Sequence, residues 1–225
     1  MVKDERFVVE TLTELKWNFG SERPLMVIGH SSESVDPFPG YAHDEQLVAE
    51  FLKKAIDAFP VGGHPVQCFC LKYETVSRTN GTASYFYVKD GEYAPYIVLS
   101  GKRIPPMQSM TRYLAAHEYG HVVDEWICRQ MECDKDWPVT KFDKEYAEVR
   151  GVFPESAYGG GNWHKNIGEI IANDFRILMC GVEVDFWPHP CPHPLELGDS
   201  RLVDYWQKLR EQYRFVPDTK NKEEE

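Results

Sequence analysis

Residues 117–121 read His-Glu-Tyr-Gly-His, a spacing that could hold a metal ion on one face of a helix. Residues four apart in a helix are neighbours separated by about 6 Å along its axis, so the imidazoles of His117 and His121 can point at one ion. Zinc accepts such nitrogen ligands at roughly 2.0–2.1 Å. Glu118 is rotated by about 100° from His117, so it does not ligate but can reach a water molecule beside the ion as a general base. The motif therefore predicts a hydrolytic zinc centre.

A catalytic zinc centre also needs a third protein ligand and one open position. Six residues after the second histidine, where an extended zinc motif would have a third histidine, the chain has Ile127. Glu169 is the strongest candidate, because it lies beside an apolar helical stretch on a second helix well downstream. The competing candidates are His164, Glu145 and Glu148, the last two within a charged segment that is typical of an exposed helix face.

Asp124 shares the face of the two histidines, since it follows His117 by seven residues. A carboxylate in that position could accept a hydrogen bond from a ligand imidazole and fix the orientation of the ring. An ordinary surface salt bridge is the alternative interpretation.

Apolar spacing predicts the helix that must carry the motif over about 108–130. It follows Pro105-Pro106, with Ser109 or Thr111 as its cap. Gly181 is placed to close the predicted helix over residues 165–180. The other predicted helices cover residues 4–16, 45–58, 141–150, 165–180 and 199–213.

The predicted strands lie mainly in the middle of the chain. They cover Pro24 to Ile28, Val66 to Val76, Ser84 to Val88 and Tyr93 to Leu99, and the last three read as an antiparallel meander with turns at Asn80-Gly81 and Asp90-Gly91. Strands followed by helices favour an α+β fold in one domain over residues 1–225. We expect a lobe with a small antiparallel or mixed sheet over residues 1–106 and a mainly helical lobe over residues 107–225.

The overall charge excludes some classes of partner. The formal net charge is -11 and the pI is about 5.2, which argues against nucleic acid and against an anionic membrane surface. No apolar run of about 18 residues and no secretory signal are visible, so we expect a cytoplasmic protein, with delivery into a host cell as the alternative. The six cysteines are expected to be free thiols.

Residues 117–124, His-Glu-Tyr-Gly-His-Val-Val-Asp, resemble the zinc helix of the anthrax lethal factor catalytic domain and of the related Pro-Pro endopeptidases. Downstream, residues 156–159 and 169–179 resemble the tyrosine segment and the third-ligand helix of that family. The resemblance covers roughly residues 93–180. It implies a zincin-like fold with Zn²⁺ in a cleft between the two lobes.

Carried over residue by residue, the resemblance implies His117, His121 and Glu169 as zinc ligands and Glu118 as the base. It implies Tyr158 as the hydrogen-bond donor to the developing oxyanion. The chain departs from the family one turn after the third ligand, where Asn173 replaces an acidic residue. A second departure is a glycine-rich, longer gap before that helix.

These features predict a zinc-dependent endopeptidase that acts on an extended peptide or protein substrate. We expect the substrate to add to the edge of the predicted strand over residues 93–100 by backbone hydrogen bonds. One alternative is a catalytically inactive, zinc-stabilised module that binds a peptide or a partner. A second alternative is a zinc hydrolase that cleaves a non-peptide amide. The presence of Glu118 favours an enzyme, because a structural metal site needs no base.

Overall fold

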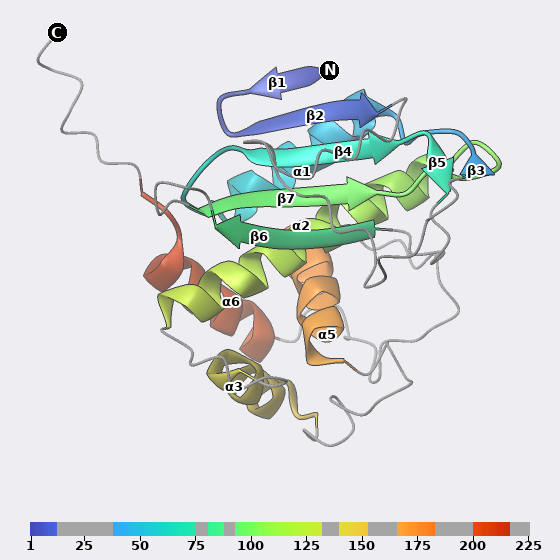
Figure 1. The fold of residues 1–225 in the computed structure, drawn as a ribbon. Coiled ribbons are helices and arrows are strands. Elements are labelled where there is room, and N and C mark those ends of the chain that lie inside the picture. Colours follow the sequence, from blue (N-terminus) through green and yellow to red (C-terminus); the bar gives the residue numbers. More distant parts are fainter. Residues whose placement is uncertain are drawn as a thin grey trace, which may run out of the picture.

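A five-stranded mixed sheet forms the centre of the molecule (Figure 1). This computed structural model describes residues 1–12, 38–74, 81–87, 93–131, 140–152, 166–182 and 200–216. Across the sheet, the strands are β1 (Val2–Asp4), β2 (Phe7–Leu12), β4 (Val66–Leu71), β7 (Tyr93–Leu99) and β6 (Gly81–Tyr87). Two short strands, β3 (Phe38–Pro39) and β5 (Tyr73–Glu74), pair separately.

The direction of the strands differs from the predicted meander. Within the five-stranded sheet, β4 runs parallel to both β2 and β7, whereas the pairs β1–β2 and β6–β7 are antiparallel. A parallel neighbour needs a long crossover connection, and helix α1 (Glu45–Ala58) lies in the connection between β2 and β4. The meander prediction is therefore wrong for β4, whereas the mixed sheet and the α+β class are confirmed.

The predicted helix over residues 4–16 is also wrong. The described part of that segment forms β1 and β2, in which Phe7 and Val9 are buried and Val8 between them is less so. That alternation has the period of a strand with one buried face. The strand predicted from Pro24 to Ile28 lies outside the described residues.

The remaining helices agree with the prediction. They are α1, α2 (Gln108–Gln130), α3 (Lys141–Arg150), α5 (Ile167–Asp174) and α6 (Ser200–Tyr213). α5 continues as a π-helical turn, Phe175–Met179, and Gly181 closes this segment with a positive φ of 60° as predicted. None of the helices in the described part of the chain has the length and apolar character needed to cross a bilayer.

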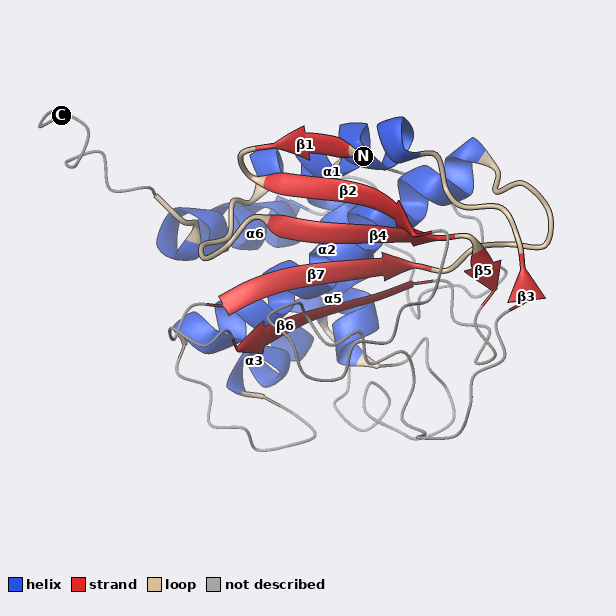
Figure 2. Cartoon of the chain, turned by 45° about the horizontal axis from the view of Figure 1, so that its top comes forward, coloured by secondary structure: helices blue, strands red, loops and turns tan. Residues whose placement is uncertain are grey.

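The helices pack on one face of the sheet, as the turned view shows (Figure 2). Side chains alternate along each strand, so Cys68 and Ile97 join the main core with α1 and α2, whereas Phe69 and Val98 belong to a smaller cluster on the opposite face. The described cysteines are free thiols, as expected, and three of the four are buried.

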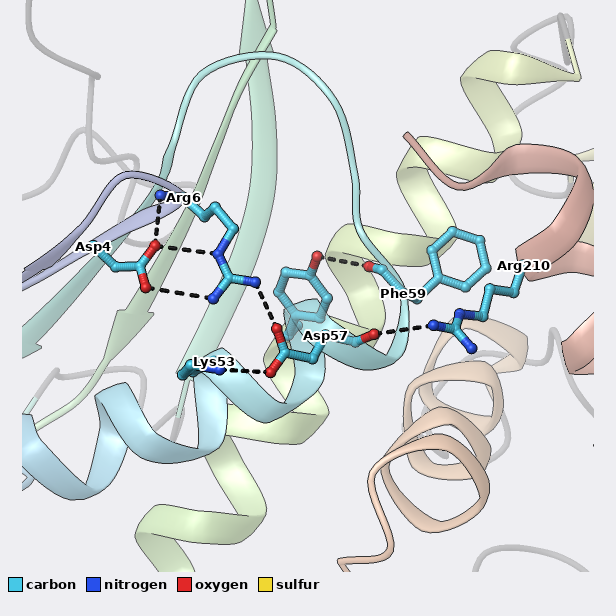
Figure 3. Close-up of polar contacts among 7 residues, drawn as sticks. Asp4, Arg6, Lys53, Asp57, Phe59 and Arg210 are labelled. Carbon is cyan, nitrogen blue, oxygen red and sulfur yellow. Dashed lines mark hydrogen bonds and ion pairs between the residues drawn. The ribbon is translucent and has the colours of Figure 1, made fainter. Parts of the chain in front are cut away.

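An ion-pair network joins the N-terminal hairpin to the helical layer (Figure 3). Arg6 bonds the carboxylate of Asp4 and, at 2.6 Å, that of Asp57 at the end of α1. Lys53 pairs with the other oxygen of Asp57, and Arg210 of α6 donates to the Asp57 carbonyl. The network fixes the edge of the sheet that lies away from β6.

Candidate metal centre

Helix α2 carries the predicted motif into the interior of the molecule. The side chains of His117 and Glu118 are buried, with 2% and 5% of their surface exposed, while His121 is only partly buried. The two imidazole centroids lie 4.8 Å apart and their planes are nearly perpendicular. Both rings therefore reach one side of the helix, as the four-residue spacing predicts.

The start of α2 is not capped as predicted. Met107 is the N-cap, with extended backbone at ψ 141°, and no side chain caps it. Since the helix begins at Gln108, the predicted caps Ser109 and Thr111 already lie within its first turn. The Thr111 hydroxyl instead lies 2.8 Å from Nδ1 of the buried His43.

Glu169 completes a cluster of three side chains that could hold a metal ion. Its carboxylate lies 3.1 Å from Nε2 of His117 through Oε2 and 3.5 Å from Nε2 of His121 through Oε1. The three ligand atoms all lie within 4.8 Å of one another. Two ligands of a tetrahedral zinc ion are about 3.4 Å apart, so two imidazole nitrogens and one carboxylate in this arrangement fit a zinc ion.

The ligand side chains are electrostatically coupled. Burial opposes ionisation of Glu169, but the charge of His121 and hydrogen bonds with both histidines outweigh it and lower the pKa of Glu169 to about 2. Burial likewise favours neutral His121, yet the carboxylate of Glu169 raises the pKa of His121 to about 9. Burial lowers the pKa of His117. Glu169 is thus negatively charged and a proton on His121 balances it, and a divalent cation held by both side chains would replace that proton.

A close contact between two small residues sets the distance from α2 to α5. A Cβ atom added to Gly120 of α2 would lie 2.7 Å from Cα of Ala172 and 2.9 Å from its carbonyl oxygen. The glycine therefore lets the two helix backbones approach closely, about one turn from His117 and one turn from Glu169. Glu169 itself lies in the first turn of α5, whose N-cap Asn166 accepts a hydrogen bond from the Gly168 amide at 3.0 Å.

Glu118 lies between α2 and the sheet. Its carboxylate packs on Gly81, the first residue of β6, where a Cβ atom would come within 2.8 Å of Glu118 Cδ. Burial raises the pKa of Glu118 to about 8, and the charge of Glu169 adds to the effect of burial while that of His121 opposes it. Gly81 begins β6 and does not lie in the turn predicted at Asn80-Gly81. A single glycine gives no local sequence signal of a packing contact with Glu118.

A second layer of contacts surrounds His117. The ring of Tyr113 stacks on His117 with 5.3 Å between centroids, and the Tyr113 hydroxyl donates to Oδ1 of Asn173 at 3.1 Å. Arg176 lies over the Tyr113 ring and also donates to Asn173. Asn173 thus contacts a residue that stacks on His117.

The two acidic residues next to the site have different surroundings. Asp174 is buried away from the ligands and accepts hydrogen bonds from Tyr146 at 2.8 Å and Arg150 at 2.7 Å. Asp124 interacts with His121 through its charge, while burial and the neighbouring Asp143 raise the pKa of Asp124. The predicted hydrogen bond from a ligand imidazole to Asp124 is replaced by this longer-range interaction.

The other predicted site residues do not join the cluster or cannot be placed. Glu145 and Glu148 are exposed on α3, as the charge pattern indicated. Tyr158 and His164 lie outside the described residues. Of the four candidates for the third ligand, Glu169 is therefore the one that the described structure brings to the histidines.

Comparisons of the chain with protein-family models, with curated proteins and with solved structures found no match.

Proposed function

We propose that this protein is a zinc-dependent endopeptidase. The observation that carries the proposal is the convergence of His117, His121 and Glu169 beside the buried carboxylate of Glu118. A structural zinc site is closed by protein ligands and needs no base, whereas a catalytic site has three protein ligands and an open position. The described cluster has three ligands and a base, which favours catalysis over the inactive binding module.

Zinc bound here would make a water molecule more acidic and would polarise the carbonyl of a scissile bond. Glu118 would take the proton from that water and deliver it to the nitrogen of the leaving amine. A divalent cation beside Glu118 would lower its raised pKa of about 8 toward neutral pH, where the group can both accept and return a proton. On the resemblance alone, Tyr158 would donate a hydrogen bond to the oxyanion.

The proposed substrate is an extended peptide. Because of the strand order, its binding strand differs from the one expected from the sequence. β7 is hydrogen-bonded to β4 on one side and to β6 on the other, so the predicted pairing of a substrate with the edge of residues 93–100 is wrong. β6 is the outermost strand on that side among the described residues, and its first residue touches Glu118. We therefore place the peptide along β6, within a zincin-like cleft between residues 1–106 and 107–225.

Glu118→Gln tests the proposal, because it keeps the size of the side chain and removes the base. We expect the purified wild type to hold about one zinc ion per chain and to cleave members of a peptide library. The variant should keep its zinc and lose activity by roughly 10²- to 10⁴-fold. Metal content is measured by elemental analysis and cleavage by mass spectrometry.

Glu125→Gln is the matched control, since Glu125 lies on the same helix and pairs with Arg129 at the surface. This control should retain full activity. A zinc-loaded wild type that cleaves no peptide would favour the binding module or a hydrolase for other amides. A zinc-loaded Glu118→Gln variant with wild-type activity would remove Glu118 as the base.

A further inference from the structure

Tyr113 links the two helices that supply the metal ligands. It lies one turn before His117 on α2, and its ring is nearly parallel to the imidazole, with 14° between the planes. Its hydroxyl donates to Asn173, one turn after Glu169 on α5. Tyr113 therefore connects His117 of α2 with Asn173, which lies in the turn of α5 that follows Glu169.

Arg176 holds the same tyrosine from the π-helical turn. Its guanidinium carbon lies 4.3 Å from the centroid of the Tyr113 ring, within the range of a cation–π interaction. One guanidinium nitrogen donates to Asn173 Oδ1 at 3.3 Å and another to the Val182 carbonyl at 2.5 Å. Only 2% of the Arg176 side chain is exposed, so the guanidinium is fixed within the protein.

We propose that Tyr113, held by Asn173 and Arg176, is a positioning residue that sets the plane of the His117 imidazole for metal binding. The rotation of an imidazole about its Cβ–Cγ bond is soft, so the side chain does not select one plane by itself. A flat aromatic ring stacked on it favours one plane, and the two polar contacts keep that ring in place. This role rests on the proposed zinc centre but not on the identity of the substrate.

Two substitutions of Tyr113 test the proposal. Tyr113→Leu removes the stacked ring and should weaken zinc binding by roughly 10- to 100-fold, as loss of an outer-layer contact typically does. Tyr113→Phe keeps the ring and removes the bond to Asn173, so affinity should fall by only about fivefold. Affinity is measured by competition with a chromophoric chelator, and the absorption bands of the cobalt-substituted protein report ligand geometry independently of affinity.

Tyr146→Phe is the matched control. The Tyr146 hydroxyl donates to Asp174, the residue after Asn173, but the ligands of the cluster are not among its ring contacts. We expect this variant to lose stability and to keep the zinc affinity and the cobalt spectrum of the wild type. Circular dichroism confirms that each variant is folded.

The outcomes separate this inference from the proposed function. Folded Tyr113 variants with wild-type affinity and an unchanged cobalt spectrum would overturn the positioning role, and so would an equal loss in Tyr146→Phe. A wild type that binds zinc and cleaves no peptide, with Tyr113→Leu still weakened, would end the peptidase proposal and support the positioning role. A wild type that binds neither zinc nor cobalt would end both.

Discussion

The carboxylate of Glu118 packs on a residue that has no side chain. Gly81 leaves the space that the carboxylate fills, and an added Cβ atom would overlap with it. Glycine is otherwise a poor choice inside a strand, because it gives the sheet nothing to pack and raises the entropy of the unfolded chain. Its presence at the start of β6 is therefore explained by the position of Glu118.

Gly81→Ala should displace Glu118 and leave the zinc ligands in place. We expect the turnover number to fall by about 10²-fold, the cost of a displacement near 1 Å, while zinc content stays unchanged. The free energy of unfolding should stay the same or rise, since alanine is less flexible than glycine. Wild-type turnover in this variant would show that the carboxylate does not need its present position.

His43 makes stability sensitive to acid. Burial, followed by the charge of Lys102, lowers the pKa of His43 from 6.5 to about 4. Because the folded state resists protonation, this contribution is complete above pH 6.5 and is lost as the pH falls toward 4, by about 2 kcal/mol between pH 7 and pH 5.

His43→Asn tests this effect, since an amide can still bond the Thr111 hydroxyl but does not titrate. Urea unfolding at pH 7 and pH 5 gives the loss of stability for each protein. The variant should lose about 2 kcal/mol less than the wild type over this interval. Equal losses in the two proteins would assign the acid sensitivity to other groups.

At the scale of elements, the approach of α5 to α2 depends on Gly120. Alanine is the better helix former by about 1 kcal/mol, so Gly120→Ala would stabilise an unconstrained helix. Here its methyl group would meet the backbone of Ala172, which cannot turn aside as a side chain can. We expect α5 to shift outward, carrying Glu169 from the histidines, so that both stability and zinc affinity fall, the latter by at least about tenfold.

Gly168→Ala is the control for this substitution. It also adds a methyl group to a helical glycine near the site, but the nearest atom would lie 3.5 Å away, an ordinary contact. Thermal unfolding and chelator competition should find the control close to the wild type. A Gly120→Ala protein that is more stable than the wild type would show that α2 and α5 can accommodate a methyl group between Gly120 and Ala172.

Three helices meet at Asp174. Its carboxylate accepts from Arg150 and Tyr146 of α3, and Trp206 of α6 donates to the Tyr146 hydroxyl at 3.1 Å. The Arg150 side chain is 6% exposed, so its pairing with Asp174 is largely shielded from water. This network ties α5 to α3 and α6.

Asp174→Asn should lower the free energy of unfolding by about 1.5–3 kcal/mol, the usual contribution of hydrogen bonds to a charged group. Glu125→Gln breaks the more exposed pair with Arg129 and should cost no more than about 1 kcal/mol. Urea denaturation of both variants gives the comparison. Equal small losses would mean that Arg150 finds another partner or water.

At the scale of the whole molecule, features that are local in sequence could be predicted and those formed by distant pairing could not. The helices over 108–130 and 45–58 follow from apolar spacing within each segment. The first residues were misjudged because Phe7, Val8 and Leu12 fit the helical period as well as that of a strand. The position of β4 between β2 and β7 depends on a crossover that no local pattern encodes.

The same distinction applies to the site. His117, Glu118 and His121 share one helix, so their grouping follows from their spacing alone. Glu169 was the strongest candidate for the third ligand from the sequence, and the packing of α5 against α2 brings its carboxylate to the two histidines. The contact of Gly81 with Glu118 had no sequence signal, because it depends on where β6 packs. Tyr113 and His117 are four residues apart on α2, so their contact follows from spacing, but the bond from Tyr113 to Asn173 depends on where α5 packs.

The distribution of the three ligands over α2 and α5 has a consequence for folding. An ion held by both helices would act as a cross-link that exists only when they are packed, so the unfolded chain would bind it far more weakly. At a free concentration about 1,000 times its dissociation constant, such a ligand adds about 4 kcal/mol to the free energy of unfolding. The supply of metal in the cell would then control how long the folded protein survives, as well as whether it acts.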